Sequence, residues 1–119
     1  MKRSIIADKA SKFSQRIIKC SYYLKSQYNE YVISKQLLKS GTSIGANITE
    51  GEYAQSKKDF IHKMNIALKE AAESEYWIKQ LRDSKLYGNN WNSLLKDCVE
   101  INKILNAIVH TTKDNLNKK

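Results

Sequence analysis

The sequence predicts an all-α protein, built as an antiparallel bundle of four helices. Its 119 residues include no proline and four glycines, which leaves little material for the turns that a β-sandwich or barrel needs roughly every 8–12 residues. Four segments instead place apolar residues at alternating spacings of three and four, which line up one face of a helix. A chain of this length is about one domain, so we expect residues 1–119 to form a single bundle.

Each expected helix carries one apolar seam. The helices cover residues of about 5–26, 30–50, 57–86 and 90–113. In that order the seams are Ile6, Ala10, Phe13, Ile17, Cys20 and Leu24; Ile33, Leu37, Gly41, Ile44 and Ile48; Phe60, Met64, Ala67, Ala71, Ser74, Ile78 and Leu81; and Trp91, Leu94, Cys98, Ile101, Leu105 and Ile108. Short connections between amphipathic helices favour antiparallel neighbours in a bundle.

Capping signals mark several helix ends. Ser56 and Asp59 form a Ser-x-x-Asp pair, a variant of the capping box that starts a helix. Gly88 is predicted to be the left-handed residue that ends the third helix. Asn89 or Asn90 is then expected to cap the fourth.

Gly41 and Gly45 lie four residues apart within the second expected helix. Each costs about 1 kcal/mol relative to alanine inside a helix, and close approach of a neighbouring helix would offset that cost. The alternative is a loop at this point, because Ser40, Thr42 and Ser43 belong to residue types that favour turns and caps. The sequence leaves both interpretations open.

Further apolar residues lie beside the seams. They are Ile18, Leu38, Ile61, Ile66, Trp77, Leu95, Val99 and Val109. A wide core stripe, which globular helices commonly have, would account for them. A second buried face, and therefore self-association, would account for them equally well.

Several protein classes are excluded. The longest uninterrupted apolar runs, such as Ile5 to Ala7, are three residues long, whereas a membrane span needs about 20. We expect no secretory signal at the N-terminus, because Asp8 and Lys9 interrupt its apolar stretch. Cys20 and Cys98 make no disulfide framework. We therefore expect a cytoplasmic protein with reduced thiols and no membrane contact.

No catalytic constellation is present, and we expect no enzyme, no metal and no cofactor. A di-iron bundle needs paired Glu-x-x-His motifs, and this chain has only Asp59-x-x-His62. Cys20 and Cys98 lie on apolar seams, where cysteine behaves as a small core residue. No Gly-Lys-Ser/Thr follows the glycines, so a phosphate loop is excluded.

The positive charge is concentrated in the first third of the chain. The formal net charge is +9, and residues 1–40 hold nine Lys or Arg against two acidic residues. Within the first helix the basic residues Lys9, Lys12, Arg16 and Lys19 form one stripe, at spacings of 3, 4 and 3. The aromatic residues that follow are Tyr22, Tyr23, Tyr28 and Tyr31.

A basic stripe leading to aromatics suits phosphate contact and base stacking. The stripe is therefore our candidate nucleic-acid-binding site. Because none of its four residues lies on the apolar seam, we expect joint reversal to glutamate to abolish binding and leave the fold intact. The other interpretation is a solvated lysine-rich face with tyrosines packed at one end of the bundle.

The second and third expected helices share a distinctive block of residues. It consists of Ser43-Ile44, Asn47-Ile48 and Glu50-Gly51, then Ser56-Lys57-Lys58-Asp59-Phe60, and further on Asn65-Ile66-Ala67 and Glu73-x-Glu75. This block resembles the signature of the 23S rRNA intervening-sequence protein family, also called four-helix bundle proteins. The family pattern is Ser-Ile-x-x-Asn-Ile-x-Glu-Gly followed by Ser-Lys-Lys-Glu/Asp-Phe.

The resemblance implies an up-down four-helix bundle that assembles as a ring, typically a homopentamer. It also implies kinship with the accessory variability proteins of diversity-generating retroelements, which are basic pentamers that bind reverse transcriptase and nucleic acid. The biochemical activity of the family is not established. The residues that match or adjoin its pattern are expected to be structural: Gly41, Gly45, Asn47, Glu50 and Gly51.

Two functions follow as hypotheses. The first is a non-enzymatic, oligomeric, basic protein that binds RNA or DNA or serves as an accessory protein. The second is a protein-interaction scaffold, without nucleic-acid contact, whose basic face meets a reverse transcriptase or another acidic partner. Salt-dependent binding to RNA and DNA would distinguish them.

Overall fold

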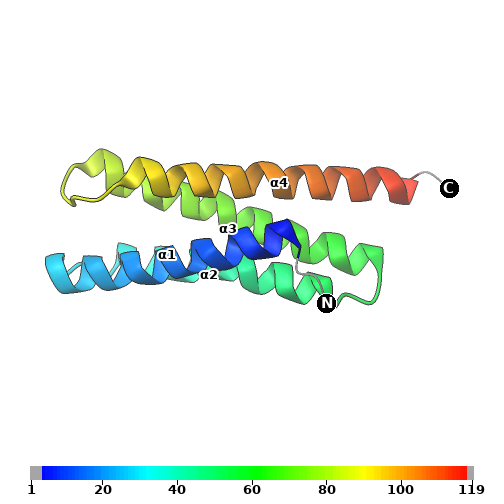
Figure 1. Cartoon of the computed structure of the whole chain (residues 1–119), viewed down its shortest axis with the longest axis horizontal. Coiled ribbons are helices and arrows are strands. Elements are labelled where there is room, and N and C mark those ends of the chain that lie inside the picture. The colour runs from blue at the N-terminus through cyan, green and yellow to red at the C-terminus, as the bar shows by residue number, and fades with distance from the viewer. Residues whose placement is uncertain (1–3, 118–119) are drawn as a thin grey trace.

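A computed structural model describes residues 4–117, which form four long α-helices and, within that range, no strand. The helices are α1 (Ile5–Tyr28), α2 (Ile33–Glu52), α3 (Lys57–Ser84) and α4 (Trp91–Asn117). Each helix starts and ends within four residues of the range expected from the sequence. Helix α4 continues as far as Asn117, beyond the end near residue 113 that the sequence predicts. In Figure 1 successive helices run in alternating directions along the long axis of a body measuring 54 × 26 × 22 Å.

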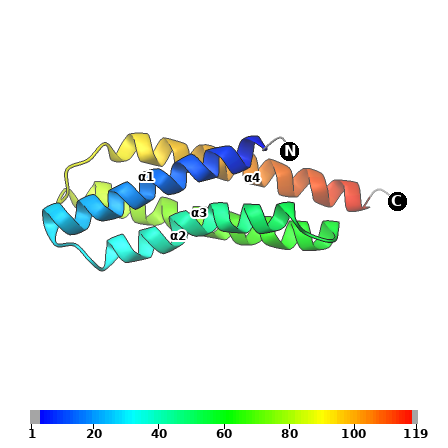
Figure 2. The same ribbon diagram turned by 60° about the horizontal axis from the view of Figure 1, so that its bottom comes forward.

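The helices pack in a cycle in which each contacts its two neighbours. Contact is extensive between α1 and α2, between α2 and α3 and between α3 and α4, whereas α1 and α4 meet over a smaller area. Figure 2 shows α1 crossing in front of α4 at an angle. The predicted seams face inward and form the core, in which Phe13, Ile17, Leu37 and Leu105 are at most 1% exposed.

The helix starts follow the sequence signals in part. Ser56 Oγ accepts a hydrogen bond from Asp59 N at 3.0 Å, and Asn90 Oδ1 accepts one from Ser93 N at 3.2 Å, so both expected caps are present. At α2 the helix start is capped by a residue that the sequence analysis did not identify. The Glu30 carboxylate accepts three backbone N–H bonds, from residues 32, 33 and 34, at 2.7–3.1 Å.

The prediction that Gly88 ends α3 in a left-handed conformation is wrong. The left-handed residue is Lys85, with φ of 60°, and no glycine has a positive φ. The helix stops earlier because Ser84 Oγ donates to Leu81 O and accepts from the backbone N–H of Leu86, which satisfies groups at the helix end locally. Gly88 instead lies in the α3–α4 connection.

The helix continues through Gly41 and Gly45, so the loop interpretation is wrong. A β-carbon on Gly41 would lie 2.8 Å from Ile17 Cγ1 and 2.9 Å from its Cγ2, closer than such atoms can approach. Gly45 is less tightly covered, since a β-carbon there would lie 3.4 Å from Ser14 Oγ. The close approach of α1 and α2 therefore depends on Gly41 much more than on Gly45.

The remaining motif residues make local contacts around the α2–α3 corner. Asn47 Nδ2 donates to Ser43 O at 2.8 Å. Glu50 forms an ion pair with Lys63 at 2.9 Å. A β-carbon on Gly51 would lie 2.6 Å from the terminal carbon of Met64. These contacts are consistent with structural roles.

The surplus apolar residues divide between core and surface. Ile61 and Val109 are buried, at 8% and 6% exposed, whereas Ile18 is 53% exposed. The rest are partly buried: Leu38, Ile66, Trp77, Leu95 and Val99. The wide core stripe thus explains some of them and leaves others in contact with solvent.

Candidate nucleic-acid interface

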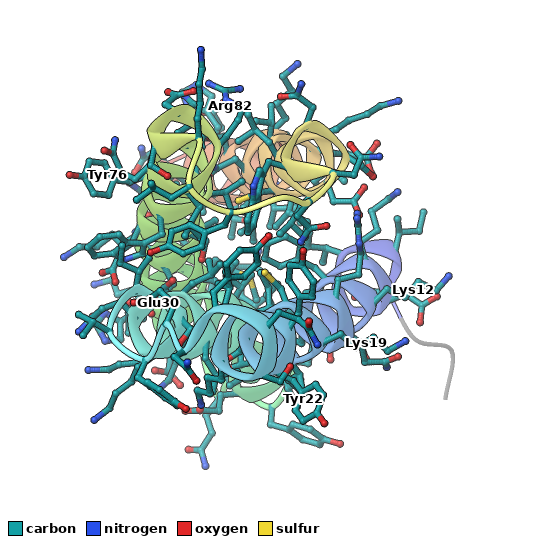
Figure 3. All side chains as sticks on the ribbon, turned by 90° about the vertical axis from the view of Figure 1, so that its left-hand side faces the viewer. Lys12, Lys19, Tyr22, Glu30, Tyr76 and Arg82 are labelled. Carbon is teal, nitrogen blue, oxygen red and sulfur yellow. The ribbon has the colours of Figure 1, made fainter. Side chains whose placement is uncertain are left out.

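The four basic residues of the stripe divide into two pairs, each with a spacing of seven residues. Lys9 and Arg16 reach toward α4, while Lys12 and Lys19 are exposed. In Figure 3, which looks along the bundle, Lys12 and Lys19 project from the same outer side of α1. The stripe therefore does not act as one uniform surface.

Lys9 forms an ion pair across the α1–α4 contact. Its Nζ lies 2.6 Å from Glu100 Oε1, and the two side chains are 39% and 52% exposed. The hydrogen bond from Lys9 to the Glu100 carboxylate raises the pKa of the Lys9 ammonium above its ordinary value. Lys9 therefore helps to join two helices, and its charge is largely matched by a neighbour.

Arg16 makes a more extensive set of contacts with α4. One guanidinium nitrogen lies 2.6 Å from Asp97 Oδ2 and 3.4 Å from Ser93 O, and the other donates to Ser93 Oγ at 3.2 Å. Several donors held at once fix the plane of the guanidinium, which a lysine could not do. Arg16 is thus positioned by α4 and is half-buried.

Lys12, Lys19 and Tyr22 form what we call the outer ridge of α1. Within residues 4–117, the structure shows no ion pair or hydrogen bond for either lysine side chain. Tyr22 follows on the same side of the helix, three residues after Lys19, and is 73% exposed. The outer ridge is therefore the part of the stripe whose lysines form no ion pair within residues 4–117.

Two of the four tyrosines pack at the end of the bundle. Tyr23 and Tyr28 meet edge to face at 5.7 Å, and Tyr28 meets Tyr87 in the same way at 5.2 Å. The Tyr23 hydroxyl donates to Gly88 O, and Gly88 N donates to the Tyr28 hydroxyl at 3.0 Å. Tyr23 and Tyr28 therefore pack at the bundle end, as the structural interpretation of the tyrosines expects.

Beside the outer ridge, α1 and the start of α4 enclose an open hollow of about 370 Å³, which we call the α1–α4 hollow. Its lining consists of Arg16, Lys19, Cys20, Tyr23, Asn89, Asn90 and Leu94. Burial raises the pKa of the Cys20 thiol to about 11, so this thiol is neutral at physiological pH. The exposed residues of the lining, Lys19, Asn89 and Asn90, are polar, whereas its buried residues are Cys20 and Leu94.

The potential metal ligands of residues 4–117 do not gather in one place, and Cys98 is buried in the core. This part of the chain holds no group of three or more His, Cys, Asp or Glu side chains placed to bind a metal ion. Burial raises the pKa of Cys98 to about 12, and its Sγ lies 3.3 Å from Ala71 O in the core. In the same range, no helix has both the length and the apolar character needed to cross a bilayer.

Sequence reasoning identified the basic stripe and missed the residues that face it. Ser93, Asp97 and Glu100 share one side of α4, at spacings of four and three. That spacing, beside the apolar seam of the same helix, was the available signal. The contribution of Asn89 and Asn90 to the hollow depends on the path of the α3–α4 connection, which periodicity does not reveal.

Comparison with known proteins places the chain in a family. The model of the 23S rRNA-intervening sequence protein family matches residues 2–107. A solved structure of a protein of unknown function, from the S23 ribosomal protein family of Bacteroides thetaiotaomicron, is 47% identical. That match covers 88% of this chain and 98% of the other, with a TM-score of 0.85. No curated protein matches. The chain belongs to the 23S rRNA-intervening sequence protein family.

Proposed function

We propose that this protein is a non-enzymatic, basic nucleic-acid-binding protein of the cytoplasm, and that it contacts phosphates through the outer ridge of α1. The observation that carries the proposal is the exposure of Lys12 and Lys19 on one side of α1, with no ion pair within residues 4–117. Two exposed lysines that form no ion pair can exchange their counterions for phosphates, which is the main source of non-specific affinity. Such contacts carry no sequence information directly.

The test is reversal of the outer-ridge charges against a matched control. We compare Lys12→Glu/Lys19→Glu with Lys96→Glu/Lys103→Glu. The control pair has the same spacing of seven residues, is also exposed and lies on α4. Both variants change the net charge by the same amount, so a general loss of positive charge affects them equally.

We expect the outer-ridge variant to bind a mixed-sequence RNA or DNA much more weakly than the control at low salt. A plot of the logarithm of its binding constant against the logarithm of the salt concentration should be less steep by roughly 1–2, because each phosphate contact contributes just under one to the slope. Fluorescence anisotropy across a salt series measures both. Equal binding by the two variants would remove the outer ridge as a nucleic-acid surface.

We further propose that the protein is a homo-oligomer of up-down bundles, with the pentameric ring that the family resemblance implies. Support comes from apolar side chains that a single bundle leaves in contact with solvent, including Ile18 at 53% exposed and the partly buried Trp77 and Val99. A ring would repeat the outer ridge and multiply its phosphate contacts through effective concentration. Light scattering tests this, and a stable 13.8 kDa species at micromolar concentration would contradict it.

The second candidate is a protein-interaction scaffold. The ion pairs of Lys9 with Glu100 and of Arg16 with Asp97 favour it. They are examples in which carboxylates on one helix pair with basic residues of this stripe, as carboxylates of a partner would. An acidic partner, such as the reverse transcriptase that kinship with accessory variability proteins would suggest, would then meet Lys12 and Lys19. Salt-sensitive capture of such a partner, without affinity for RNA or DNA, would support this function over the first.

A further inference from the structure

The α1–α4 hollow has features of a ligand site that the phosphate-binding proposal does not use. Its volume of about 370 Å³ falls within the roughly 300–1,000 Å³ of small-ligand sites. It opens directly beside the outer ridge, since Lys19 belongs to both. A strand held on the ridge would therefore pass the mouth of the hollow.

The polar groups of the hollow are almost all hydrogen-bond donors. Asn89 Oδ1 accepts from the backbone N–H of Asn90 at 2.7 Å, and Asn90 Oδ1 accepts from the backbone N–H of Ser93. Both amide oxygens are thus engaged, and the amide NH₂ groups remain. Within residues 4–117, Asn90 Nδ2 has no partner, and Asn89 Nδ2 reaches only the Cys20 sulfur, at 4.0 Å.

The walls of the hollow are apolar or planar, and they are held in place. The Tyr23 hydroxyl is tied to Gly88 O, which fixes its ring. The guanidinium of Arg16 is fixed by Asp97 and Ser93. Leu94 is 3% exposed and lies at the base. Aromatic rings and guanidinium planes are the surfaces on which proteins stack nucleobases.

Charge limits the kind of ligand that fits. Asp97 matches the charge of Arg16, so Lys19 supplies the one cation of the lining without an ion pair within residues 4–117. One unmatched cation, several neutral donors and an apolar base suit a ligand with one phosphate, carbonyl acceptors and a flat ring. Uracil and thymine present two carbonyl oxygens and no amino group, whereas adenine, cytosine and guanine each present an amino donor.

We propose that the α1–α4 hollow holds one unpaired nucleotide of a single strand, with preference for uracil or thymine. Its phosphate meets Lys19, its ring lies against Tyr23 and Leu94, and its carbonyl oxygens accept hydrogen bonds from the amides of Asn89 and Asn90. This rests on the proposed function, because the outer ridge delivers the strand. A paired base cannot enter, since it would first have to leave the duplex stack.

The test compares base preference in three proteins. The parent chain, Asn89→Asp/Asn90→Asp and Asn92→Asp are titrated with labelled oligouridine, oligoadenosine and a mixed RNA duplex. Aspartate keeps the capping oxygen at position 90, where it serves as well as asparagine, and removes the NH₂ donor. Asn92→Asp introduces a negative charge in the same turn of α4, outside the lining of the hollow.

We expect the parent to prefer oligouridine over oligoadenosine by about two- to tenfold, the range that one net hydrogen bond supplies. The double variant should lose this preference, and Asn92→Asp should keep it even if all its affinities fall. A parent without the preference, or a double variant that retains it, would overturn the assignment. If free uridine monophosphate binds as tightly as the oligomer, the hollow is a site for a free nucleotide, and the proposal that it holds part of a single strand is refuted.

The two proposals fail in different ways. Equal, salt-sensitive binding of the parent to oligouridine, oligoadenosine and duplex would refute a nucleotide site in the hollow. It would remain in accord with phosphate contact through the outer ridge. Absence of binding to all three would refute both.

Discussion

Alanine at Gly41 and alanine at Gly45 should have opposite effects on stability. A helical Gly→Ala change alone gains about 1 kcal/mol. At Gly41 the new β-carbon would lie 2.8–2.9 Å from two carbons of Ile17. Ile17 is fully buried and β-branched, so it cannot turn aside in its helix. Overpacking of this kind costs about 1–3 kcal/mol.

The net change is therefore a loss of about 0–2 kcal/mol for Gly41→Ala. For Gly45→Ala we expect a gain approaching 1 kcal/mol, because the contact with Ser14 is 3.4 Å. Urea unfolding followed by circular dichroism, at one fixed protomer concentration, measures both.

A double-mutant cycle with Ile17→Ala isolates the cause. With the Ile17 side chain truncated, Gly41→Ala should become stabilising, because the clashing carbons are gone. If Gly41→Ala and Gly45→Ala change stability equally, or if the Ile17 background makes no difference, close packing of α1 on α2 is not the reason for Gly41.

Three further outcomes are expected. Glu30→Ala should lower the free energy of unfolding by about 1 kcal/mol, as loss of a helix cap does, and unchanged urea unfolding would argue against a capping role. Burial raises the pKa of Cys20 to about 11 and of Cys98 to about 12, so a thiol reagent at pH 8 should modify both only after unfolding. Because these thiols ionise near pH 9.0 once unfolded, their contribution to stability should be complete below that pH and fall above it. Arg16→Glu should lower the melting temperature by placing a carboxylate against Asp97, and adding Asp97→Arg should restore part of the loss; no restoration would argue against the pair.

The helices could be predicted because their signals are local and agree with one another. A seam such as Phe13, Ile17 and Leu24 has only one helical face to occupy, and that face is buried. The close approach at Gly41 could be proposed but not settled, because its reason is a side chain on another helix. The left-handed residue that ends α3 could not be identified, since the competing hydrogen bonds of Ser84 carry no strong sequence signal.

Sequence periodicity could predict only part of the candidate site. Periodicity placed Lys9 and Lys12 on one stripe of α1, whereas in the structure Lys9 pairs with α4 and Lys12 is exposed. It did not tell which lysine would find a carboxylate, because that depends on the angle at which α4 crosses α1. The crossing brings Glu100 to Lys9 and leaves Lys12 to solvent. The hollow next to the stripe depends on the same crossing and on a loop.

The division of the basic stripe into two residues paired with α4 and two exposed lysines changes how its role in binding can be tested. Reversal of all four basic residues would place glutamate beside Glu100 and Asp97, where the structure shows two ion pairs at 2.6 Å. Like charges at that distance repel, and they would do so where α1 and α4 already meet over the smaller area. The expectation that such a variant keeps its fold is therefore revised: lost binding could then reflect a loosened bundle. Reversal of Lys12 and Lys19 alone leaves both ion pairs in place, so only that variant reports on nucleic acid.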